Sequence, residues 1–117
     1  MTDGVRRFHV GHRMSEMAIH RGTVHLAGQV AGDATQDVKS QTIQVLAAVD
    51  RLLHEAGTNK TRVVTAQIFL ADLTDFASMN EVRDTWVTPG EAPPRATVQA
   101  RRVRPEWKID IVVTAAL

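Results

Sequence analysis

The sequence of 117 residues contains no cysteine. Disulfide bonds and thiolate chemistry are therefore excluded, and the absence is compatible with the reducing cytoplasm, where we expect the protein to be located. Aromatic residues are also scarce, at 4% of the chain. This scarcity argues against a surface that stacks the bases of a nucleic acid.

The chain also lacks a large excess of either charge and lacks long apolar runs. The 14 basic and 13 acidic residues are interspersed and leave a net charge of +1, so a general electrostatic grip on phosphate is not expected. No apolar run is long enough for a signal peptide or a membrane span, and we expect a mature chain with no membrane partner. With 44% hydrophobic residues, the length fits one domain over residues 1–117.

Hydrophobic periodicity predicts a mixture of strands and two helices. The strands are expected over residues 5–10, 17–20, 23–30 and 62–71, with two more within 95–114, and the helices over 36–56 and 75–87. Arg21 and Gly22 form the expected turn of a tight hairpin, and Gly57 is placed to end the first helix. Asp33 or Thr35 is the expected N-cap of that helix. The strand over 62–71 is expected to be buried on both faces.

The stretch from residue 92 to residue 114 predicts a hairpin that carries the site. The Pro93-Pro94 pair holds the entering chain extended, and the two strands are expected to fold back at residues 104–106. Strand alternation would then place Arg95 and Asp110 on the same mixed face. A guanidinium at a strand start can bind a small carboxylate, and a nearby carboxylate can handle a proton or a water.

Two amphipathic helices can cover only one face of so wide a sheet. The face left bare is expected to carry His25, Gln29, Gln67, Phe69, Arg95, Thr97, Asp110 and Val112. Such a face is too apolar to remain in water and too polar for an ordinary core. We therefore predict a closed symmetric oligomer with pockets at the seams between subunits.

Other interpretations of the same residues remain open. Arg95 and Asp110 can form a salt bridge at an interface instead of a site. His9 and His12 have a spacing that can chelate, but without a carboxylate cluster they make a poor metal site. The cluster Arg101, Arg102 and Arg104 fits a solvated hairpin end, or else a contact with RNA.

Five segments in order resemble the Rid-type (YjgF-type) family. They are SEMAIHRGTVHLAGQV at 15–30, QVLAAVDRLLHEAG at 44–57, QIFLADLTDFASMN at 67–80, PPRATVQA at 93–100 and KIDIVVTA at 108–115. The resemblance covers nearly the whole chain. It implies an α+β, chorismate-mutase-like fold, with a mostly antiparallel sheet of about six strands, two helices on one face and a trimeric barrel.

The resemblance also implies roles for particular residues. Arg95 matches the arginine that holds the substrate carboxylate, and backbone N–H groups of Gly28 and Thr97 help to hold it. Asp110 stands where a glutamate usually positions the hydrolytic water, and Asn80 matches an asparagine near the pocket. Four positions mark a divergent member of the family: Asp110 is shorter than the usual glutamate, Met14, an expected substrate-binding position, replaces a common tyrosine, Ala27 replaces a common serine, and Thr97 a frequent cysteine.

The activity implied by the family is hydrolysis of reactive enamine and imine acids, of the 2-iminobutanoate or 2-iminopropanoate deaminase type. The expected partners are a small 2-imino or 2-oxo acid and two further copies of the chain, and no metal or organic cofactor is needed. Two alternatives stay open. One is a non-catalytic or regulatory trimer that binds small carboxylates, and the other is an RNA-directed ribonuclease or translation inhibitor.

Overall fold

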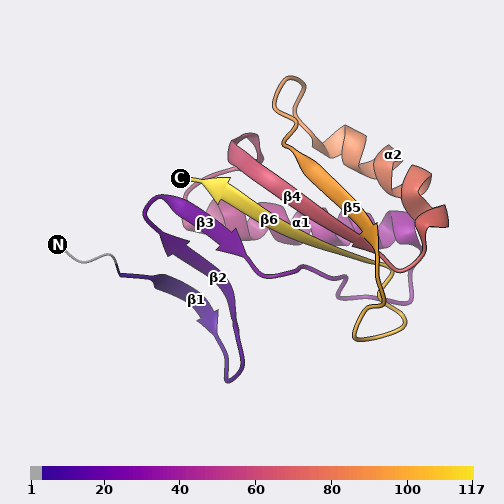
Figure 1. Ribbon diagram of the computed structural model, residues 1–117, viewed down its shortest axis with the longest axis horizontal. Helices are drawn as coiled ribbons and strands as arrows, with labels where there is room; N and C mark the ends of the chain where they lie inside the picture. The colour runs from indigo at the N-terminus through magenta and orange to yellow at the C-terminus, as the bar shows by residue number, and fades with distance from the viewer. Residues whose placement is uncertain (1–3) are drawn as a thin grey trace.

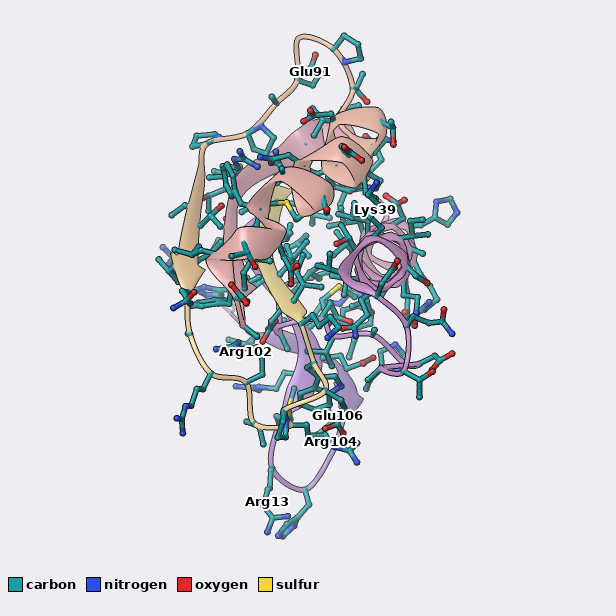
Figure 2. All side chains as sticks on the ribbon, turned by 90° about the vertical axis from the view of Figure 1, so that its right-hand side faces the viewer. Arg13, Lys39, Glu91, Arg102, Arg104 and Glu106 are labelled. Atoms are coloured by element: carbon teal, nitrogen blue, oxygen red, sulfur yellow. The ribbon has the colours of Figure 1, made fainter. Side chains whose placement is uncertain are left out.

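Two helices lie on one face of a six-stranded sheet in the computed structural model, which describes residues 4–117 (Figure 1). The strands are β1 (Arg6–Val10), β2 (Ser15–His20), β3 (Thr23–Leu26), β4 (Val63–Leu70), β5 (Arg95–Gln99) and β6 (Ile109–Ala116). The helices are α1 (Val38–Ala56) and α2 (Phe76–Trp86), with short 3₁₀ turns at Lys60–Arg62 and Leu73–Asp75. Figure 2 shows both helices on the same side of the sheet.

The sheet has the strand order β1-β2-β3-β6-β4-β5. Only the pair β4–β5 is parallel among the described strand pairs, and the other four pairs are antiparallel. The predicted class, a mostly antiparallel sheet of about six strands with two helices on one face, is therefore confirmed. Within the described residues, neither helix combines the length and the apolar character needed to cross a bilayer.

Local sequence signals explain the ends of these elements. Arg21 and Gly22 both have positive φ, at 51° and 78°, as a tight two-residue hairpin between β2 and β3 requires. Gly57 ends α1 with φ at 90°. The expected N-cap was wrong: the Asp37 side chain accepts a hydrogen bond from the Ser40 N–H and caps α1. Asp33 instead stabilises the preceding loop by accepting from the N–H of Thr35.

The core lies between the helices and the covered face of the sheet. Side chains of α1 pack there against alternate residues of β2, β3, β4 and β6, which are Met17, Ile19, Val24, Leu26, Ala66, Ile68, Ile109 and Ile111. The expectation that β4 is buried on both faces was wrong. Its residues alternate, so that Ile68 is fully buried whereas Thr65 and Gln67 are exposed on the opposite face.

The predicted hairpin of β5 and β6 was wrong, because β4 lies between these strands (Figure 1). The chain crosses from β4 through α2 and enters β5 parallel to β4 at the edge of the sheet. Residues 100–108 then pass the end of β4, where the Ala100 N–H donates to Leu70 O and the Ala71 N–H donates to Lys108 O. A helical crossover thus determines the position of β5.

This topology moves Arg95 and Asp110 to opposite faces of the sheet. Residues that are direct partners in neighbouring strands share a face. Arg95 is the partner of Ala66 in the core-facing register of β4, whereas Asp110 is the partner of Phe69 on the bare face. The predicted common face is therefore wrong for Arg95 and for Thr97, the partner of Ile68.

The rest of the predicted bare face is confirmed with one exception. His25, Gln67, Phe69, Asp110 and Val112 share it, as the pairings of β3, β4 and β6 show. Gln29 does not, because it is the partner of the buried Ile111 and is itself buried. We call the surface formed by Thr65, Gln67, Phe69, Ala96, Val98, Asp110, Val112 and Thr114 the open face.

Candidate functional site

Arg95 begins β5 and reaches sideways to α2. Its Nη1 donates a hydrogen bond to Asn80 Oδ1 at 2.6 Å, and its guanidinium lies 5.5 Å from the centre of the Phe76 ring. Phe76 and Asn80 are four residues apart on α2, so they present one helical face to the arginine. Arg95 remains exposed, and the contact with Asn80 engages one of its five N–H groups. The side chain is therefore both oriented and open to an anion.

The main chain of β5 adds donors at the same edge. Pro94 O accepts from the Ala66 N–H, and the Ala100 N–H donates to Leu70 O. The alternation of a parallel ladder then turns the main-chain groups of Arg95 and Thr97 toward the open edge of the sheet. The part that the Thr97 N–H plays in holding a carboxylate stays a prediction.

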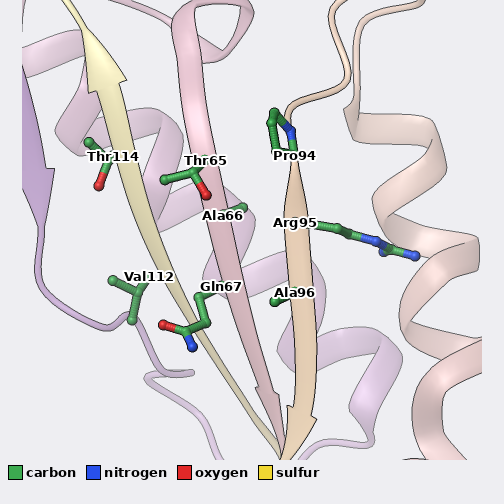
Figure 3. A pocket seen from close by; sticks show the side chains of 8 residues that line it. All are labelled: Thr65, Ala66, Gln67, Pro94, Arg95, Ala96, Val112 and Thr114. Carbon is green, nitrogen blue, oxygen red and sulfur yellow. The ribbon is translucent and has the colours of Figure 1, made fainter.

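A pocket of about 410 Å³ lies beside this edge, on the open face. It is lined by Thr65, Ala66, Gln67, Pro94, Arg95, Ala96, Val112 and Thr114. Figure 3 shows the guanidinium of Arg95 directed away from Gln67 and Val112 and toward α2. The edge strand β5 thus separates the pocket from the arginine head group within one protomer.

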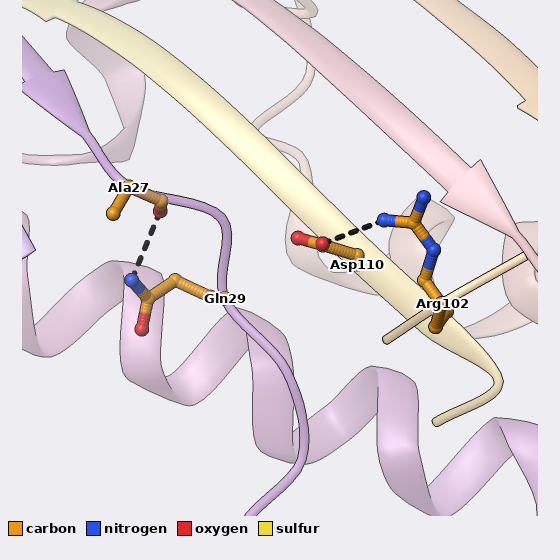
Figure 4. A network of polar contacts seen from close by, with 4 residues as sticks. All are labelled: Ala27, Gln29, Arg102 and Asp110. Atoms are coloured by element: carbon orange, nitrogen blue, oxygen red, sulfur yellow. Dashed lines mark hydrogen bonds and ion pairs between the residues drawn. The ribbon is translucent and has the colours of Figure 1, made fainter. Parts of the chain in front are cut away.

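Asp110 forms a second centre on β6. Its Oδ2 accepts a hydrogen bond and ion pair from Arg102 Nη1 at 2.7 Å, as Figure 4 shows. Arg102 also lies 4.8 Å over the ring of Phe69. Burial raises the pKa of the Asp110 carboxyl above its ordinary value, and the charge of Arg102 and its hydrogen bond oppose that rise. Asp110 Oδ1 and Arg102 Nε are buried without a hydrogen-bond partner.

Gly28 lies directly against this carboxylate. A Cβ at that position would stand 2.5 Å from Asp110 Oδ1, so only glycine allows the observed approach. Gln29 fixes the segment, because its N–H donates to Ile111 O and its side-chain amide donates to Ala27 O (Figure 4). A glycine in a strand-like segment is typical of such a close approach.

The predicted site residues therefore divide into two groups within one protomer. Arg95, Asn80 and Thr97 lie at the edge near α2, and Asp110 and Gly28 lie together on β6 and the segment after β3. Met14 joins neither group. It is 57% exposed in the turn between β1 and β2, which lie at the opposite edge of the sheet from β5.

Two arginines of this region were missed or misinterpreted by sequence reasoning. Arg83 is only 6% exposed, and its Nη2 is buried without a hydrogen-bond partner. Burial lowers the pKa of Arg83, and the nearby charge of Arg95 adds to this effect. Its spacing of three residues from Asn80 on α2 is the signal that could have found it.

Arg102 is the arginine that was misinterpreted. The arginines of residues 101–104 were interpreted as a solvated hairpin end, and this interpretation was wrong for Arg102. Its side chain is 16% exposed and turned onto Asp110, whereas Arg104 is exposed and pairs with Glu106 at 3.1 Å. Figure 2 shows Arg102 apart from Arg104 and Glu106, which lie close together. Only the exposed members of the triplet remain available to RNA.

The histidines do not form a common metal site in the described part of the chain. His9 Nε2 lies 2.9 Å from Glu55 Oε2, and this contact is an ion pair when the imidazole is protonated. Glu55 raises the pKa of His9 through the hydrogen bond and through its charge. No group of three potential metal-binding side chains occurs within residues 4–117.

The fold and the two centres define a small α+β protein of the chorismate-mutase-like class. Residues 6–117 match the family described as endoribonuclease L-PSP. A RutC family protein of Haemophilus ducreyi is 43% identical over 113 residues, which cover 97% of this chain and 97% of that protein. The RutC family protein YoaB of Escherichia coli is 42% identical over 105 residues, covering 90% and 91%.

Solved structures agree with these relatives. A member of the YjgF protein family from Neisseria meningitidis superposes with a TM-score of 0.93 at 41% identity, covering 97% of this chain and 95% of that chain. A protein from Pseudomonas aeruginosa superposes with a TM-score of 0.94 at 41% identity, covering 97% and 98%. The chain belongs to the RutC/YjgF (Rid) family, as its sequence segments indicated.

Proposed function

We propose that this protein hydrolyses reactive 2-imino and enamine acids to 2-oxo acids and ammonia. Membership of the RutC/YjgF family is consistent with the enamine/imine deaminase class. The observation that supports the proposal most directly is the exposed guanidinium of Arg95, which Asn80 and Phe76 hold in place. A fixed guanidinium with free N–H groups suits a small carboxylate, which it can bind through two parallel hydrogen bonds.

The complete site forms between protomers in this proposal. Arg95 and Asp110 of one chain lie on opposite faces of the sheet, so they cannot both contact one small molecule. In a closed homotrimer, Arg95 of one subunit would meet Asp110 of a neighbour across the seam. The open face favours such an assembly, because it carries the exposed Val98 and the half-buried Val112 among polar side chains.

The chemistry then needs little more than positioning. Arg95 holds the carboxylate, so that C2 of the C=N group is fixed beside the neighbouring Asp110. A water adds to C2 while Asp110 accepts a proton from it and passes that proton to the imine nitrogen. Asp110 then transfers the hydroxyl proton of the resulting carbinolamine to its amine, and ammonia leaves as C2 forms the carbonyl bond to oxygen, which gives the 2-oxo acid. The proposed reaction needs no metal or organic cofactor.

The engagement of Asp110 favours one alternative. Its Oδ2 is bound by Arg102 and its Oδ1 lies against Gly28, so a protein that binds small carboxylates without turnover is the second candidate. Binding of a 2-oxo acid such as 2-oxobutanoate without ammonia release would favour it. The RNA-directed activity has less support, because Arg102 is turned onto Asp110 and leaves only Arg101 and Arg104 exposed.

Substitution of Arg95 tests the proposal. Ammonia release from an imine made by an amino-acid oxidase should fall by at least about 100-fold in Arg95→Ala, which loses the carboxylate contact. The matched control is Arg101→Ala, which removes an exposed arginine six residues away and should leave the rate unchanged. Oligomer size should be the same in both variants. Full activity of Arg95→Ala would contradict the proposed role of this arginine.

A further inference from the structure

Arg102 differs from the other arginines of the β5–β6 connection because it turns onto the open face. Its side chain is 16% exposed, and it lies between the ring of Phe69 and the carboxylate of Asp110. Arg101 and Arg104 remain exposed. Burying a long, flexible arginine from a loop restricts its rotamers, so the contacts that it gains must offset that loss.

The ion pair leaves part of each partner unused. Arg102 contacts Asp110 through Nη1 alone, and Arg102 Nε and Asp110 Oδ1 make no hydrogen bond. A two-bond fork would have satisfied both groups. The contact therefore orients the carboxylate and leaves the buried Oδ1 without a hydrogen bond, while 18% of the Asp110 side chain as a whole stays exposed.

Among the described residues, one charged side chain acts on the Asp110 carboxylate. β4 contributes the uncharged Phe69, and the segment after β3 contributes Gly28. The group whose charge acts on the carboxylate is Arg102. Its charge opposes the rise in the pKa of Asp110 that burial causes.

We propose that Arg102 is a positioning residue that fixes the orientation of the Asp110 carboxylate and favours its ionised form, in which it can accept a proton. This inference rests on the function proposed above for Asp110. Arg102 does not contact the substrate in this account. It acts through the carboxylate, in the protomer that contributes Asp110 to the seam.

The first experiment measures the titration of the Asp110 carboxyl carbon by NMR in the intact protein. In Arg102→Ala the midpoint should rise by about one pH unit, because an opposite charge is removed from a partly buried acid. Arg102→Lys should retain most of the wild-type midpoint, and Arg101→Ala should titrate as wild type. An unchanged midpoint in Arg102→Ala would overturn the inference, whatever happens to activity.

The second experiment measures imine hydrolysis against pH for the same variants. The acidic limb of kcat should move to higher pH in Arg102→Ala and return in Arg102→Lys, while KM changes by less than about twofold. A uniform loss of rate at every pH would show a structural role and overturn the inference. If Arg102→Ala does not fold, Arg102→Gln replaces it in both experiments.

These measurements separate the inference from the proposed function. The carboxyl titration does not depend on turnover, so wild-type protein without imine hydrolysis would overturn the proposed function alone. A shifted titration combined with an unmoved pH profile would show that Asp110 handles no proton in the reaction, and it would overturn the positioning role.

Discussion

Gly28 shows how a single residue can shape the candidate site. The space for its missing side chain is occupied by the carboxylate of Asp110, which Arg102 holds from the other side. Any side chain at position 28 has to displace that carboxylate or the segment after β3. The tolerance of this position therefore measures how tightly the acid is held.

Gly28→Ala should destabilise the protein by about 1–3 kcal/mol, because its methyl group would stand too close to Asp110 Oδ1. Imine hydrolysis should fall with it, since the carboxylate has to turn away. The matched control is Gly32→Ala, where an added Cβ meets nothing within 4 Å, and stability should change by less than about 0.5 kcal/mol. Urea unfolding at one protomer concentration measures both. Equal stability of the two variants would contradict this packing.

Arg83 carries a buried guanidinium nitrogen without a hydrogen-bond partner in the protomer. Because burial disfavours the charge, Arg83→Leu should leave the free energy of unfolding unchanged or raise it by about 1 kcal/mol or more. The control Arg51→Leu changes an exposed arginine of α1 and should shift stability by less than about 0.5 kcal/mol. A loss of stability in Arg83→Leu would show that the assembled protein supplies a partner to Arg83.

Among the helices and strands, the features that depend on local interactions were predicted correctly, and those that depend on contacts between distant residues were not. α1 and the turn at Arg21-Gly22 depend on local periodicity and on backbone conformation, and both were predicted. The pairing of β5 was not, because residues 95–99 are compatible with either neighbour. The choice of β4 follows from the crossover through α2, which local patterns do not reveal.

The candidate site shows the same division. Arg95 and Asp110 were selected from the residues and from family resemblance, but their common face followed from the wrong hairpin. Arg102 was interpreted, together with Arg101 and Arg104, as part of a solvated hairpin end or of an RNA contact. Its turn onto Phe69 and Asp110 depends on contacts between distant strands. Such contacts become visible only once the sheet is assembled.

The edge strand β1 is joined to α1 by the pair of His9 and Glu55. Glu55 raises the pKa of His9 in the folded protein, so the ion pair stabilises the fold. This stabilisation is fully present when the pH is below the pKa of His9 in the unfolded chain, and it is lost as the pH rises through the pKa of His9 in the folded protein. Glu55→Gln should therefore lower Tm at about pH 5.5 and leave it unchanged at about pH 8.5. A difference that grows with rising pH would contradict the pairing.

The whole molecule places the two halves of the proposed site on opposite faces of one sheet. The arginine half is oriented by α2, and the acid half is held by Arg102 and Gly28. In the proposed site neither half is complete by itself, and the open face, which carries Asp110, exposes the apolar side chain of Val98. Assembly into a closed ring would cover that face and complete the site in a single step, because each seam joins the two different halves.

Subunit mixing tests this central claim most directly. Arg95→Ala and Asp110→Asn proteins, each inactive alone, are unfolded, combined in equal amounts and refolded together. Random assembly should restore about one quarter of wild-type imine hydrolysis, since only seams with an intact residue from each partner are active. As a control, wild type is mixed equally with the double variant Arg95→Ala/Asp110→Asn. The mixture should retain about one quarter of the wild-type activity if the site lies between two chains, and about one half if the site lies within one chain. A mixture of the single variants that stays inactive would contradict the composite site.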